Sequence, residues 1–114
     1  MDLSKPLKKE LRQLLGVGHE RLLAAELRGL DARFGAWKAG EIDAFELSQQ
    51  IHVFHNGPQR ELYVRFSTRG IETTMVSGLV VDGVLSEGDL SPELLEALTP
   101  EIDSIRSWRG EKVD

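Results

Sequence analysis

His52 and His55 are the residues of this sequence whose types and spacing come closest to a chemical site. Residues three apart on an α-helix lie on one face, so both imidazole rings could reach the same metal ion. A catalytic zinc site needs a third protein ligand, for which the candidates are His19 and Glu61, and neither has a diagnostic spacing. One hypothesis is therefore a metal-binding protein or enzyme built on His52, His55 and Glu61.

The alternative for both histidines is structural. In the last turn of a helix, a protonated His55 would interact favourably with the carbonyl end of the helix dipole. His52 lies between Ile51 and Val53, so it would flank the core and bond to a backbone carbonyl. Because two ligands are too few for a metal site, we predict no metal, and no cofactor.

Residues 35–46 resemble part of the calcium loop of an EF-hand. Gly40, Ile42 and Glu46 match its glycine, its central apolar residue and its bidentate glutamate. The match ends there, because the positions that should supply side-chain oxygen ligands are occupied by Gly35, Trp37 and Ala39. Capping of the following helix explains Glu46 better than calcium binding does.

Other catalytic patterns are missing from the sequence. It has no cysteine, which excludes disulfides, thiolate metal sites and cysteine nucleophiles. Neither Ser48 nor Ser67 belongs to a motif that links a serine to a histidine and an acid. Gly16-Val17-Gly18 lacks the third glycine and the Lys-Ser/Thr pair of phosphate-binding loops. The sequence therefore identifies no catalytic residue and favours a non-enzymatic protein.

A weak nucleic-acid-binding regulator is a further hypothesis. Its footprint would be the basic start of the chain, and a helix-turn-helix within residues 44–66 would offer few arginines for base contacts. The net charge of −5 argues against binding a polyanion, and no aromatic residue interleaves the basic side chains to stack on bases. The basic residues of this footprint are Lys5, Lys8, Lys9 and Arg12.

The composition is that of a folded globular domain. The 114 residues include 40% hydrophobic and 29% charged residues, enough for one hydrophobic core. No segment approaches the roughly 20 apolar residues of a membrane helix, and no signal sequence is visible. We expect a cytoplasmic protein without a membrane partner, and a single domain over residues 1–114 whose last residues, 110–114, fray.

Charge is unevenly distributed along the chain. Residues 1–40 hold eight basic and five acidic residues, whereas residues 71–114 hold three basic and ten acidic ones. The attraction between these ends favours a chain folded back on itself, or a head-to-tail contact between copies. Simple solubility is the alternative explanation.

Residues 41–66 hold the clearest structural signals. Asp43 and Glu46 form a helix-starting capping box, and Asn56-Gly57-Pro58 combines a helix stop with a restart at Pro58. These signals predict a tight corner between two helices at residues 55–58. Polar side chains converge at this corner, so we take as candidate interaction residues His52, His55, Asn56, Arg60, Tyr63 and Arg65.

The remaining segments also favour helices. Leucines recur at helical spacing from Leu7 to Leu30, and Gly16-Val17-Gly18 is either a short break or a weak point in one long helix. Residues 71–85 fit a helix or a β-hairpin, of which we favour the helix. Ser91-Pro92 and Thr99-Pro100 each indicate a helix start.

Together these patterns predict an all-α fold, a compact bundle of about six helices in a single domain. A small helical protein without a catalytic motif most often acts by contact with other proteins. The leading hypothesis is therefore a non-enzymatic interaction or accessory module that binds a protein partner or itself as a homodimer.

Overall fold

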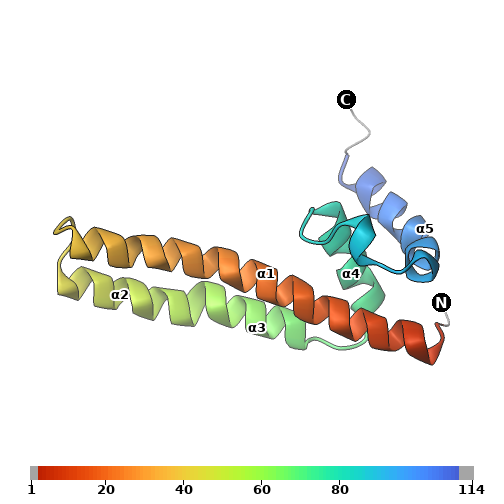
Figure 1. The fold of residues 1–114 in the computed structure, drawn as a ribbon, viewed down its shortest axis with the longest axis horizontal. Helices are drawn as coiled ribbons and strands as arrows, with labels where there is room; N and C mark the ends of the chain where they lie inside the picture. The colour runs from red at the N-terminus through yellow and green to blue at the C-terminus, as the bar shows by residue number, and fades with distance from the viewer. Residues whose placement is uncertain (1–2, 111–114) are drawn as a thin grey trace. The chain divides into compact units, whose positions relative to one another are not determined.

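The computed structural model describes residues 3–110, which form helices and connecting turns without a strand (Figure 1). The all-α prediction is confirmed. No helix in this part of the chain is long and apolar enough to cross a membrane. The α-helices are α1 (Lys5–Lys38), α2 (Ala44–Phe54), α3 (Arg60–Ser67), α4 (Glu72–Val81) and α5 (Pro92–Trp108), with a π-helical turn at His55–Gln59 and a 3-10 turn at Glu87–Asp89.

The chain divides into two compact units, and α1 contributes to both. Within the described residues, unit 1 comprises 3–18 and 69–110, and unit 2 comprises 19–68. The expectation of a single domain over residues 1–114 stays a prediction. Residues 110–114 were predicted to fray, and residues 111–114 lie outside the described residues.

Unit 1 holds most of the buried apolar side chains. The start of α1 packs with α4 and α5 around a core in which Leu79, Leu94 and Leu98 are fully buried. A part-buried polar contact joins α1 to the start of α5: the Glu10 carboxylate accepts hydrogen bonds from Ser91 N and Ser91 Oγ, both at 2.7 Å. Ser91 Oγ in turn accepts from Leu94 N at 3.2 Å, which confirms Ser91 as the N-cap of α5.

Unit 2 is an antiparallel helical hairpin. The second half of α1 pairs with a rod made of α2, the π-helical turn and α3 (Figure 1). The ring of His19 stacks on that of Phe66 with centroids 4.7 Å apart, and Arg33 Nε donates to Gln50 Oε1 at 2.7 Å. Residues at the start of this half of α1 thus contact residues at the end of the rod, as antiparallel pairing requires.

The predicted corner at residues 55–58 is wrong. The backbone stays helical through the π turn, and Gly57 does not adopt a positive φ. The reason is the apolar spacing: Phe54, Pro58, Leu62 and Phe66 are half-buried and recur every four residues. Side chains four residues apart rotate progressively around a helix of 3.6 residues per turn. The π turn has more residues per turn, so it accommodates one extra residue and directs the later side chains back toward α1.

The number of helices is also lower than predicted. Residues 3–110 contain four helical rods rather than about six, because three predicted interruptions are absent. One is the corner; the second is the possible break at Gly16-Val17-Gly18, which α1 crosses, and the third is the helix start at Thr99-Pro100, which α5 crosses. In α5, Leu94, Leu98 and Ile102 are each at most 2% exposed, and their burial offsets the cost of Pro100, which is about 3 kcal/mol.

Several local signals were predicted correctly. Residues 71–85 contain the helix α4 and no hairpin, and Gly83 ends α4 with φ of +81°. Asp43 Oδ1 accepts a hydrogen bond from Glu46 N at 2.8 Å, so Asp43 is the N-cap of α2. Gly40 follows α1 with φ of +80°, the left-handed conformation expected of a glycine that ends a helix.

Candidate interaction surface

The predicted polar residues at 52–56 lie on one exposed side of unit 2. Asn56 Nδ2 is 3.1 Å from His52 Nε2, and His55 Nδ1 is 3.4 Å from Gln59 Oε1. Both pairs are four residues apart along the rod and involve exposed side chains. Each imidazole therefore contacts a neighbouring amide instead of converging on a shared point with the other.

The predicted residues on α3 do not all lie on one side of that helix. Tyr63 is 66% exposed, and the Arg65 guanidinium lies over the Phe66 ring, 5.3 Å from its centroid. Arg60 and Arg65 are exposed and five residues apart, so helical geometry directs them to different sides of α3. The six candidate residues therefore do not all share one side of the rod.

The ligand set considered for a metal does not come together. Among the residues that the structure describes, no group of three His, Asp or Glu side chains is placed to hold a metal ion. His19, one of the two candidates for a third ligand, stacks on Phe66. His52, His55 and Glu61 are all exposed.

Unit 2 buries almost none of its apolar side chains, which are exposed or half-buried. All of its residues are described, and Leu47, at 5% exposure, is the one that is buried. Two helices in contact can cover only one side of each other, so the flanks of the hairpin remain open. Its exposed large apolar residues are Leu27, Trp37, Phe45, Ile51, Val53, Tyr63 and Val64.

One flank of the hairpin is hollowed into a groove of about 310 Å³. Its floor is apolar, and Val53 on its wall is 54% exposed. A Cβ added at Gly29 would meet no atom within 4 Å, so the groove is open at that point. Helix α1 contributes Glu26, Gly29, Leu30 and Arg33, and the opposite rod contributes Gln50, Val53, Phe54 and Pro58.

Polar groups at the groove are held in a chain of hydrogen bonds. Arg33 Nε donates to Gln50 Oε1 at 2.7 Å, and Gln50 Nε2 donates to Glu46 Oε2 at 3.3 Å. The Arg33 guanidinium keeps further N–H donors for a ligand, since it has five in total. The groove thus combines an apolar floor with an oriented cation and the nearby carboxylate of Glu26.

Sequence reasoning missed this groove, because its two walls come from separate segments of the chain, residues 26–33 and 50–58. The signal that could have found it is the run of small residues on α1, where Ala25, Gly29, Ala32 and Ala36 recur at helical spacing. Small side chains on an exposed helix flank leave room for another chain to approach.

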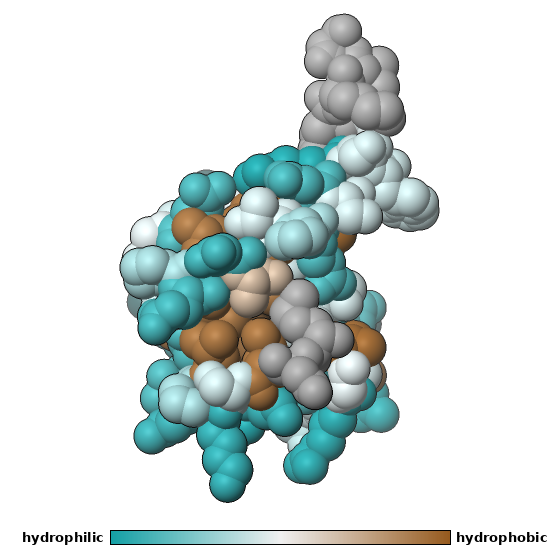
Figure 2. Space-filling view, turned by 90° about the vertical axis from the view of Figure 1, so that its right-hand side faces the viewer, coloured by the Kyte–Doolittle hydropathy of each residue, from teal (hydrophilic) through white to brown (hydrophobic). Residues whose placement is uncertain are grey.

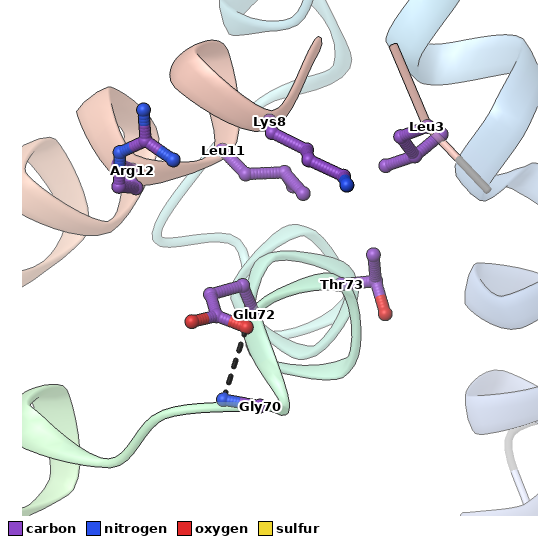
Figure 3. A pocket seen from close by; sticks show the side chains of 7 residues that line it. All are labelled: Leu3, Lys8, Leu11, Arg12, Gly70, Glu72 and Thr73. Atoms are coloured by element: carbon purple, nitrogen blue, oxygen red, sulfur yellow. Dashed lines mark hydrogen bonds between the residues drawn. The ribbon is translucent and has the colours of Figure 1, made fainter. Parts of the chain in front are cut away.

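A second cavity, of about 410 Å³, lies in unit 1 (Figure 3). Lys8, Leu11 and Arg12 of α1 line one side, and Gly70, Glu72 and Thr73 line the other. Two residues of the predicted basic footprint therefore share a cavity with a carboxylate, and Glu72 Oε1 also accepts a hydrogen bond from Gly70 N at 3.2 Å. This mixture of charges is not the uniformly basic surface that a nucleic acid requires.

Apolar side chains are also visible on the face that Figure 2 views, the side of Figure 1 where α1 begins. Most of them lie near the middle of this face, with smaller groups elsewhere on it and hydrophilic side chains around them. In unit 1 the exposed large apolar residues include Ile71 and Trp108.

Comparisons of the chain with known protein families, with curated proteins and with solved structures gave no match.

Proposed function

We propose that this protein is a non-enzymatic protein–protein interaction module and that its binding surface is the groove of unit 2. The observation that carries the proposal is the hairpin's exposure: of its 50 residues, one is buried, while an apolar groove stays open on one flank. An open apolar surface with polar groups at its edge is characteristic of a protein-binding site.

The energetics favour a partner in the groove. Complete burial of a valine or leucine side chain contributes about 1.5–3 kcal/mol relative to leaving it exposed. Val53 is half exposed and Leu30 is half-buried, so a partner that covers both gains a substantial part of this free energy. Arg33 adds orientation, because arginine is enriched among the residues that dominate binding at interfaces.

Two valines of equal exposure provide the test. Val53 lies in the groove and Val64 lies outside it, and each is 54% exposed. The protein is immobilised on an affinity matrix, and the proteins that it retains are identified. We expect Val53→Asp to abolish their binding, because the partner would bury an uncompensated carboxylate. Val64→Asp should retain them. Equal binding by the wild type and both variants would contradict the proposal.

The metal-binding and nucleic-acid-binding hypotheses have no comparable support. The described residues hold no three-ligand group for a metal. Two of the four basic residues proposed to bind nucleic acid, Lys8 and Arg12, share a cavity with the carboxylate of Glu72.

A further inference from the structure

The groove wall on α1 has an internal symmetry. Glu26, Gly29, Leu30 and Arg33 follow one another at steps of three, one and three residues, so the stripe reads the same in both directions about the midpoint between Gly29 and Leu30. When the stripe is reversed, Glu26 exchanges places with Arg33, and Gly29 exchanges places with Leu30. A surface of this kind is complementary to its own copy turned end to end.

We infer that the occupant of the groove is a second copy of this chain, with the two α1 helices packed antiparallel about that midpoint. Glu26 then lies opposite Arg33 of the second copy, and Arg33 lies opposite Glu26 of the second copy. Leu30 of each copy meets the open space at Gly29 of the other. This is an isologous two-fold interface, in which one patch is used twice. The inference rests on the proposed function and names its partner.

The same stripe continues the pattern at both ends. Leu22 and Trp37 lie four residues beyond Glu26 and Arg33, so they become opposite one another in the antiparallel pair. Leu22 is half-buried and Trp37 is 41% exposed, and each offers apolar surface to the other. The overlap covers residues 22–37 of each α1, all within unit 2.

Charge selects this arrangement over a parallel one. Parallel packing would place Glu26 against Glu26 and Arg33 against Arg33, which is repulsive, whereas antiparallel packing makes two opposite-charge pairs. Unit 2 as a whole has six basic and seven acidic residues, so its net charge of −1 hardly opposes association of two copies. Two hairpins joined in this way form a four-helix bundle, in which the two hairpins share one core.

The experiment reverses the charges one at a time and then mixes the variants. In Glu26→Arg, both pairs become Arg–Arg; in Arg33→Glu, both become Glu–Glu. We expect each variant alone to raise the dimer dissociation constant about tenfold or more in sedimentation velocity runs at several concentrations. An equimolar mixture of the two should restore the dimer, because each Arg then faces a Glu. The double variant E26R/R33E should also dimerise.

The design separates loss of binding from loss of folding. Misfolded variants could not rescue each other, and the two substitutions change the net charge in opposite directions. Arg28→Glu is the matched control, since it makes the same charge change on α1 outside the groove and should leave the dimer intact. Gly29→Leu should weaken the dimer by filling the space for Leu30, while Gly35→Leu, also in open space on α1 and outside the groove, should not.

The outcomes also separate this inference from the proposed function. A wild type that is monomeric at every concentration overturns the inference, as does a dimer that both charge reversals leave unchanged. If Val53→Asp still abolishes binding of other proteins in that case, the groove remains an interaction surface with a different occupant. If Val53→Asp has no effect on any binding, the proposed function fails as well.

Discussion

Ser77 of α4 is fully buried in unit 1, and its hydroxyl oxygen has no hydrogen-bond partner within the described part of the chain. A buried polar group without a partner costs about 1–3 kcal/mol. Alanine removes that group and is also the better helix former. We therefore expect Ser77→Ala to raise the free energy of unfolding by about 1–2 kcal/mol, measured by urea denaturation.

The control for this substitution is Ser104→Ala in α5, where the serine is exposed and only the helix propensity changes. A gain at Ser77 no larger than the gain at Ser104 would show that the buried hydroxyl is satisfied in solution.

At the same scale, residue types were a better guide to exposure than to the proposed binding site. The sequence identified His52, His55 and Asn56 as surface residues, and the structure leaves them exposed in local side-chain pairs. It did not identify Arg33 or Val53, because neither belongs to a motif. Their significance arises when α1 and α2 pair and enclose the groove, which is a property of tertiary packing and not of local spacing.

At the scale of the element, two glycines of α1 allow a matched prediction. A Cβ added at Gly16 would meet no atom within 4 Å, whereas one added at Gly18 would lie 2.7 Å from Leu79 Cδ1. We expect Gly16→Ala to stabilise the protein by about 1 kcal/mol, because glycine is a poor helix former. Gly18→Ala should lose this gain or destabilise, because fully buried Leu79 would have to move. Urea denaturation measures both.

Gly35→Ala is the control for this pair, since Gly35 lies in the same helix with open space around it. An equal gain from all three substitutions would mean that α4 accommodates the methyl group at Gly18 freely.

Helix caps were easier to predict than interruptions within a helix. Asp43 and Ser91 cap α2 and α5 as expected, because a cap is formed by residues three positions apart and needs no tertiary partner. The expected helix starts at Pro58 and Pro100 are absent, since the helix continues through each proline. A proline inside a helix costs about 3 kcal/mol. In α5 the burial of Leu94, Leu98 and Ile102 offsets this cost.

At the scale of the whole molecule, the two units differ in how many apolar side chains each of them buries. Eleven of the twelve buried hydrophobic residues in the described part belong to unit 1, and Leu47 alone belongs to unit 2. The fold class could be predicted from helical periodicity. This imbalance could not, because it depends on which helices pack together.

The imbalance leads to a prediction about unfolding. If a second copy completes the core of the hairpin, the stability of unit 2 must rise with protein concentration, whereas that of a self-contained unit does not change. Trp37 belongs to unit 2 and Trp108 to unit 1, so Trp108→Phe leaves Trp37 as the single tryptophan. We expect the fluorescence of Trp37 to report a urea midpoint that increases over a hundredfold range of concentration. The same variant carrying Arg33→Glu should show a lower midpoint at each concentration, because its dimer is weaker. A constant midpoint in the Trp108→Phe protein would exclude self-association as the source of the hairpin's stability.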